Sequence, residues 1–130
     1  MGIATESPRD QRVLLIDDDP IQLRVREAVL RDAGIPVDVA TTADSALALL
    51  RSNSGASVGT IVTDHIMPGT SGAIFVHQLR DVRPGIPVIV ISGLAEAEDE
   101  YAGLDVTFRM KPYPPPELIK LVREKLGSTH

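Results

Sequence analysis

The chain contains no cysteine, which excludes disulfides, a thiolate nucleophile and a cysteine-based zinc site. Basic residues are in the minority, with 13 Lys and Arg against 18 Asp and Glu, so we expect no direct contact with nucleic acid or anionic lipid. No apolar run approaches the ~18 residues of a membrane span, and the first residues lack the pattern of a signal peptide. We therefore expect a cytoplasmic protein without a membrane partner.

The length and composition are those of a single globular domain. The chain has 130 residues, of which 43% are hydrophobic, enough to form one core. The first residues are polar and carry no periodic pattern. We expect a mobile N-terminal tail at 1–12, one domain at 13–127 and a short C-terminal tail at 128–130.

Short β-branched runs alternate along the chain with longer stretches of helical periodicity. The runs predict strands at 13–17, 37–41, 60–64, 88–92 and 106–110. The periodic stretches predict helices at 21–32, 43–51, 71–82, 95–102 and 114–126, whereas 53–57 is typical of an exposed loop. This alternation predicts an α/β fold, an open parallel sheet with helices on both faces and the second strand at an edge. Ligands of such sheets bind beyond the carboxyl ends of the strands.

Acidic residues gather at that edge of the predicted sheet. Asp17 and Asp18 follow the first strand, and Asp64 ends the third. Several carboxylates in one place need a cation or a basic side chain among them, and Mg2+ prefers oxygen ligands of this kind. Lys111, at the end of the fifth strand, can supply a positive charge. Ser92, at the end of the fourth, can donate a hydrogen bond to a phosphoryl oxygen. Asp64 is the candidate nucleophile for phosphoryl transfer.

Each of these residues also has an ordinary structural interpretation. The acidic run before Pro20 could serve only to start a helix, and Asp64 could be a turn residue. Taken singly, Lys111 would be a surface lysine and Ser92 a hydroxyl at a strand end. His65 follows Asp64, but alternation along an extended segment directs it away from that site, so it receives no role. Only the combination of residues indicates function.

The chain resembles the receiver domain of two-component response regulators over nearly its whole length. The family's acidic pair matches Asp17 and Asp18, its phosphorylated aspartate matches Asp64, its Ser/Thr matches Ser92, and its Lys-Pro matches Lys111-Pro112. The resemblance implies a flavodoxin-like (βα)5 sheet with strand order 2-1-3-4-5. It also implies phosphoryl transfer from a histidine kinase or histidine phosphotransfer protein onto Asp64, and signalling to an unknown downstream protein.

The resemblance further implies roles for individual residues around the site. Mg2+ would be bound by Asp18, by Asp64 and by the backbone carbonyl of Ile66, with Asp17 acting through water. Ser92 and Phe108 would form the switch that responds to phosphorylation, and the Lys111-Pro112 bond would be cis. Ile66 and Leu94 stand at positions that tune the lifetime of the phosphoryl group in the family.

The chain departs from the family pattern between Ser92 and Lys111, where it is shorter by about one helical turn. We therefore expect a shortened or irregular fourth helix, in a region made acidic by Glu96, Glu98, Asp99 and Glu100. A similar shortening occurs in receivers attached to hybrid histidine kinases, and the chain could be a stand-alone regulator or part of a longer protein. As a receiver it would transfer a phosphoryl group only to its own aspartate, and would not be an enzyme acting on other substrates.

Two alternatives remain open at this point. Asp17 and Asp19 form a D-x-D at a strand end, as in aspartate-nucleophile phosphatases of the haloacid dehalogenase type. The altered fourth helix would instead suit a receiver-like interaction module that signals without phosphate. The three hypotheses differ in whether Asp64, Asp17 or neither carries a phosphoryl group.

Overall fold

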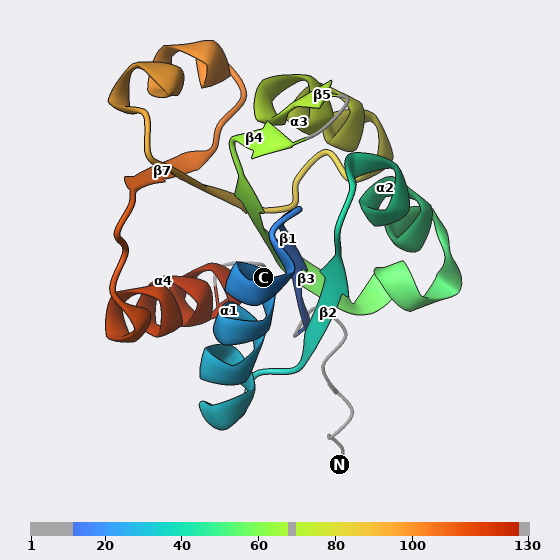
Figure 1. Ribbon diagram of the computed structural model, residues 1–130. Helices are drawn as coiled ribbons and strands as arrows, with labels where there is room; N and C mark the ends of the chain where they lie inside the picture. Colours follow the sequence, from blue (N-terminus) through green and yellow to red (C-terminus); the bar gives the residue numbers. More distant parts are fainter. Residues whose placement is uncertain (1–11, 68–69, 128–130) are drawn as a thin grey trace.

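The computed structural model describes residues 12–67 and 70–127 and shows a parallel sheet between two layers of helices (Figure 1). The five strands of this sheet lie in the order β2-β1-β3-β6-β7. They are β2 (Val37–Ala40), β1 (Arg12–Ile16), β3 (Val58–Asp64), β6 (Val88–Ser92) and β7 (Thr107–Met110). Counted along the chain, this is the predicted order 2-1-3-4-5, and all neighbouring strands of this sheet pair in parallel.

Helices cover both faces of the sheet, as predicted. Those described are α1 (Pro20–Asp32), α2 (Ala43–Arg51), η2 (Asn53–Ser57), α3 (Gly72–Val82), η3 (Ala95–Tyr101) and α4 (Pro115–Gly127), where η marks a 3-10 helix. Helices α1 and α4 lie together on one face, and α2, α3 and η3 lie on the other (Figure 1).

The two faces follow from the alternation of side chains along the strands. In β1, Val13 and Leu15 belong to the core shared with α1 and α4, whereas Leu14 and Ile16 belong to the core shared with α2 and α3. All four are at most 1% exposed. A strand covered on both faces has no polar side, which explains the uninterrupted apolar run in the sequence.

Side-chain caps fix where three of the helices begin. The Asp19 carboxylate accepts hydrogen bonds from two backbone N–H groups of the first turn of α1, Thr42 forms a capping box with Ser45 in α2, and Ser71 caps α3. These caps satisfy backbone donors that have no partner within the helix. Helix α1 therefore leaves the sheet directly after Asp17 and Asp18, which holds both residues at the sheet edge.

Two details differ from the sequence expectations, and a third agrees with them. Residues 53–57, which were expected to be an exposed loop, form the 3-10 helix η2. Gly55 in this helix is buried against the end of α2, where a Cβ atom would lie 2.5 Å from the Leu49 carbonyl oxygen. The hairpin of β4 (Ile66–Met67) and β5 (Thr70–Ser71) was not predicted, since strands of two residues have no recognisable pattern. The fourth helix is shortened as expected, and it is a 3-10 helix.

The expected tails lie outside the described residues, except that Arg12 belongs to β1. Its guanidinium group pairs with the Asp38 carboxylate of β2 at 2.8 Å. Within the described part of the chain, no helix is both long and apolar enough to cross a membrane.

Candidate functional site

The carboxyl ends of four adjacent strands carry the predicted site residues. Asp17 follows β1, Asp64 ends β3, Ser92 ends β6 and Lys111 follows β7. The register aligns these ends, since Ile16 pairs with Thr63, Asp64 with Ile91, and Ser92 with Met110. Residues up to 94 positions apart in numbering are thereby brought to one edge of the sheet, where ligands of open α/β sheets bind.

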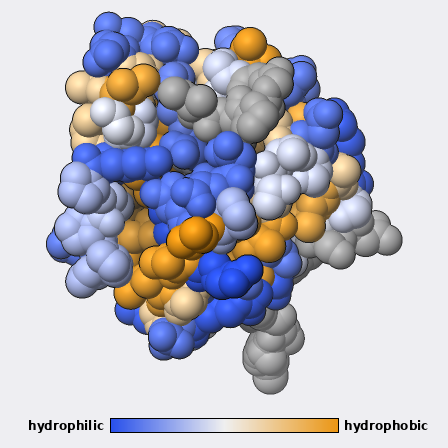
Figure 2. Space-filling model, viewed as in Figure 1, coloured by the Kyte–Doolittle hydropathy of each residue, from blue (hydrophilic) through white to orange (hydrophobic). Residues whose placement is uncertain are grey.

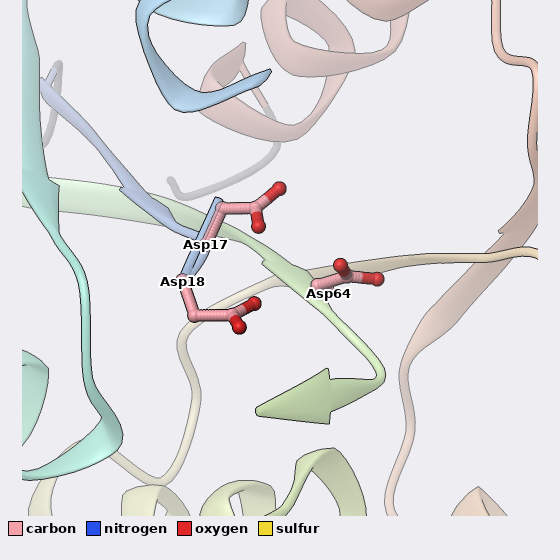
Figure 3. A group of neighbouring side chains, drawn as sticks. All are labelled: Asp17, Asp18 and Asp64. Carbon is pink, nitrogen blue, oxygen red and sulfur yellow. The ribbon is translucent and has the colours of Figure 1, made fainter. Parts of the chain in front are cut away.

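Asp17 and Asp64, together with Asp18, form a cluster of carboxylates (Figure 3). One oxygen atom from each of Asp17, Asp18 and Asp64 lies within 4.8 Å of the other two. Asp17 is buried, Asp18 is exposed and Asp64 is intermediate, so the cluster opens to solvent on one side. The donor set consists only of carboxylate oxygens, which suits a hard divalent cation such as Mg2+ better than a soft one.

Lys111 brings a positive charge to this cluster. Its Nζ atom donates a hydrogen bond of 3.1 Å to Oδ2 of Asp64. Oδ1 of Asp64 accepts a hydrogen bond of 2.9 Å from the backbone N–H of His65. Both oxygens of this carboxylate therefore have a donor, and the Asp64 side chain keeps 13% of its surface exposed. Asp64 is thus held in one orientation and can still be reached from outside.

Asp17 is held more firmly than Asp64. Its Oδ1 atom accepts a hydrogen bond of 2.9 Å from the backbone N–H of Asp19. Its Oδ2 atom accepts from two side chains of α1, the Gln22 amide and the Arg26 guanidinium, the latter at 3.3 Å. Neither α1 residue was predicted, because a polar residue in an amphipathic helix normally faces solvent. The only sequence signal that could have indicated these contacts is the spacing of Gln22 and Arg26, which follow Asp17 by five and nine positions.

Ser92 ends β6 and lies beside Lys111, which follows the neighbouring strand β7. The Ser92 side chain is 2% exposed, and its Oγ atom accepts a hydrogen bond of 2.9 Å from the backbone N–H of Leu94. The Lys111 backbone N–H donates to the Ser92 carbonyl at 2.8 Å, which joins β6 to the segment that carries the lysine. The Lys111-Pro112 peptide bond is cis, as the family resemblance implied.

The residues expected to form the switch or tune the lifetime lie around this edge. Phe108 is half-buried in β7 and contacts the Tyr101 ring at a centroid distance of 6.1 Å. The Leu94 side chain is 42% exposed. The backbone of Ile66 belongs to β4, whereas its side chain lies outside what the structure describes.

A buried pair that was not predicted links the residue after Asp64 to η3. His65 and Tyr101 are 6% and 4% exposed, and a hydrogen bond of 2.7 Å joins His65 Nδ1 to the Tyr101 hydroxyl. His65 Nε2 also lies 3.6 Å from a carboxylate oxygen of Glu100. The prediction that His65 receives no role at the carboxylates agrees with this geometry. Its contacts with Tyr101 and Glu100 of η3 could not be predicted from alternation alone.

The Tyr101 hydroxyl lies against the start of α3. A Cβ atom on Gly72 would be 2.2 Å from this hydroxyl and 2.9 Å from the His65 carbonyl oxygen, so only glycine fits there. Burial raises the pKa of the Tyr101 phenol well above its ordinary value, and the nearby charges of Glu100 and Asp64 act in the same direction. The phenol is therefore neutral at physiological pH, and its hydroxyl serves as a structural contact.

Comparison with known families explains this arrangement. The family model described as "Response regulator receiver domain" matches residues 13–123. The chain belongs to this family. Receiver domains bind Mg2+ in general and act in two-component signalling through histidine kinases or phosphotransfer proteins, and their role is generally non-catalytic. The acidic cluster described above has the composition that such a domain needs.

Two of the curated relatives are transcriptional regulatory proteins. The transcriptional regulatory protein PrrA of Mycobacterium tuberculosis is 37% identical over 135 residues, which cover 99% of this chain and 55% of PrrA. The hydrogenase transcriptional regulatory protein HoxA of Cupriavidus necator is 35% identical over 128 residues, covering 94% of this chain and 25% of HoxA. This receiver domain thus spans about half the length, or less, of these two relatives.

Solved receiver domains share the fold over nearly their whole length. The response regulator receiver domain protein of Methanospirillum hungatei superposes with a TM-score of 0.83 at 26% identity, covering 92% of this chain and 96% of that one. The response regulator receiver protein of Sinorhizobium medicae gives 0.78 at 30% identity, with 93% and 98% covered. These likenesses favour neither alternative hypothesis. The phosphatase alternative also conflicts with the Asp19 carboxylate, which caps α1.

Proposed function

We propose that this receiver domain accepts a phosphoryl group on Asp64 from the histidine of a kinase or phosphotransfer protein. The observation that carries the proposal is the carboxylate cluster with Lys111 bonded to Asp64 at 3.1 Å. In the transfer, the bond between phosphorus and the donor's imidazole nitrogen breaks, and a bond between phosphorus and an Asp64 oxygen forms. The chain itself is the acceptor, so the reaction does not turn over a separate substrate.

The residues present fit a divalent cation. Asp18 and Asp64, with the backbone carbonyl of Ile66, would hold Mg2+, and Asp17 would act through water. When bound, the metal supplies positive charge that stabilises the phosphoryl oxygens. Lys111 would shift from the Asp64 carboxylate to a phosphoryl oxygen, since the ammonium group has three donors on a flexible stem. The Ser92 hydroxyl can rotate to donate to another phosphoryl oxygen.

The α1 side of the site offers a surface on which the phosphodonor can dock. A groove of about 480 Å³ runs between α1 and the start of α4, and its lining includes Val25, Pro112, Tyr113 and Lys111. Ile21 is 75% exposed and Val25 is 56% exposed, and apolar side chains gather over α1 in Figure 2. Exposed apolar side chains of this kind mark interaction surfaces. A helix seated in the groove would bring its histidine close to Asp64.

The conformational response to phosphorylation would involve the side of the site formed by β6 and β7. Ser92 and Phe108 lie on neighbouring strands, and Phe108 contacts Tyr101, which belongs to η3. A shift of the Ser92 hydroxyl toward the phosphoryl group would break its bond with the Leu94 backbone and free the start of η3. We therefore propose that η3 and β7 form the surface that changes for the downstream protein.

The central test is intact mass spectrometry after incubation with acetyl phosphate and Mg2+. We expect one phosphoryl adduct in the wild type, none in Asp64→Asn and none after metal removal. Asp19→Asn is the matched control, because asparagine caps helices as well as aspartate does, and it should form the adduct normally. An adduct that persists in Asp64→Asn, or no adduct in any sample, would contradict the proposal.

The docking surface has a separate test. Val25→Glu should slow phosphoryl transfer from the phosphorylated partner protein and leave the reaction with acetyl phosphate unchanged. Val39→Glu is the control, since Val39 is similarly exposed, at 41%, on the edge strand β2. Equal effects of the two variants on transfer from the protein donor would place docking elsewhere.

A further inference from the structure

Arg26 occupies an unusual place for a charged side chain of an amphipathic helix. Its side chain is only 13% exposed, and its guanidinium reaches the Asp17 carboxylate at 3.3 Å. Asp17 is itself 1% exposed. Burial of a guanidinium is unfavourable unless an opposite charge compensates. Burial accordingly lowers the pKa of Arg26, and the charges of Asp17 and Asp64 oppose that shift.

The pairing gives the carboxylate cluster a second positive charge within the protein. Lys111 faces Asp64, and Arg26 faces Asp17 from the other side. Two cations thus stand against the three clustered carboxylates, so most of their charge is balanced without a metal. Arginine stays protonated at all physiological pH values, which makes this compensation permanent.

A divalent cation bound at the carboxylate cluster would lie close to the positive charge of Arg26. Oδ2 of Asp17 already accepts hydrogen bonds from Gln22 and Arg26, so its lone pairs are committed to donors on α1. The guanidinium charge also repels a dication held a few ångströms away. Both effects act against metal binding, and the first belongs to Arg26 and Gln22 alone, because Lys111 bonds to Asp64 and not to Asp17.

We propose that Arg26 is a resident counter-cation that competes for Asp17 with the hydrated divalent metal, which would reach this carboxylate through water, and that it keeps the metal affinity of this receiver below what its carboxylates alone would give. The inference rests on the proposed function, because it assumes that the cluster binds Mg2+. Its consequence is that the metal-free state is nearly charge-balanced and stable. Phosphorylation would then depend on the Mg2+ concentration over a higher range than in the absence of Arg26.

Isothermal titration of the metal-free protein with MgCl2 tests the inference. We expect Arg26→Gln to bind Mg2+ about ten-fold more tightly than the wild type, the order of change for removing one unit charge near a dication. Arg24→Gln removes the same charge from an exposed position of α1 and should stay within about two-fold of wild type. Asp18→Asn should abolish binding and thereby locate the metal.

Thermal unfolding gives an independent measurement. Without a metal, Arg26→Gln leaves the buried Asp17 carboxylate without its charged partner, so the variant should melt lower than wild type in EDTA. Saturating Mg2+ should raise the melting temperature of Arg26→Gln by more than it raises that of the wild type. A purely structural role for Arg26 would lower both melting temperatures equally and leave the Mg2+ affinity unchanged.

The outcomes separate the inference from the proposed function. If the wild type binds Mg2+ and Arg26→Gln binds equally or more weakly, the inference is overturned and the proposed function stands. If neither protein binds Mg2+, both are overturned. Should Arg26→Gln fail to fold, the guanidinium NMR signal of Arg26 in the wild type decides the question. It should change with the same Mg2+ dependence as the Asp64 amide, and a constant signal would refute the competition.

Discussion

The buried hydrogen bond between Tyr101 and His65 allows a sharp prediction about stability. Tyr101→Phe removes one hydroxyl and leaves the ring in place, so packing against Phe108 is kept. The His65 Nδ1 atom then loses its 2.7 Å partner in a site where both residues are at most 6% exposed. A buried polar atom left without a partner costs about 1–3 kcal/mol. For a domain of this size, this corresponds to a decrease in melting temperature of about 4–12 °C.

The chain supplies its own control, since it contains only two tyrosines. The hydroxyl of Tyr113 makes a long contact of 3.5 Å to the Glu117 carbonyl at the surface, so Tyr113→Phe should cost less than about 0.5 kcal/mol. Thermal and urea unfolding followed by circular dichroism measure both variants. Equal melting temperatures for the two variants would refute the idea that the buried bond stabilises η3.

A double-mutant cycle tests whether His65 is the partner that matters. His65→Leu alone leaves the Tyr101 hydroxyl unpaired, whereas His65→Leu combined with Tyr101→Phe leaves an apolar contact. The double variant should therefore be more stable than the sum of the two single changes predicts, by about 1 kcal/mol or more. Additive effects would show that the two residues contribute to stability independently.

Three further predictions concern the same region. Burial raises the pKa of Tyr101 in the folded protein above its value in the unfolded chain. The contribution of the neutral phenol to stability is therefore complete below about pH 10 and is lost as the pH rises further. In urea titrations at alkaline pH, the wild type should lose more stability than Tyr101→Phe. Gly72→Ala places a Cβ atom 2.2 Å from the Tyr101 hydroxyl and 2.9 Å from a backbone oxygen and should lower the unfolding free energy by about 3 kcal/mol or more; a shift below about 1 kcal/mol in urea would contradict the contact. Ile66→Asn introduces a group that can hydrogen-bond an attacking water and should shorten the lifetime of phosphorylated Asp64 several-fold; an unchanged decay rate would show that this position does not tune it.

The order of strands and helices was predictable because burial on both faces leaves a strong periodic signal. The β1 run from Val13 to Ile16 is an example, since all four side chains are at most 1% exposed. The placement of Asp17, Asp64 and Lys111 at one edge also followed from sequence, because the carboxyl ends of parallel strands coincide. Their roles in phosphoryl transfer remain predictions.

The residues that sequence did not reveal act across elements. Arg26 reaches Asp17 from one helix, and Tyr101 reaches His65 from another. Each belongs to a residue type that commonly sits at a surface or in a core, so neither is distinctive alone. Their contacts depend on where helices settle on the sheet, which local patterns do not encode. The β4–β5 hairpin was missed for a simpler reason, because each of its strands has only two residues.

The alignment of four strand ends also determines which parts of the domain can be modified. Because β1, β3, β6 and β7 each place a candidate site residue at the carboxyl edge, a shift of one residue in any ladder would displace that residue by about 3.3 Å. The opposite edge carries no such constraint. Gly85 lies there, exposed, in the turn that leads into β6. An additional module grafted at that turn should therefore leave the positions of Asp17, Asp64 and Lys111 unchanged, provided that the Arg80 hydrogen bonds to the Pro84 and Ile86 carbonyls are kept.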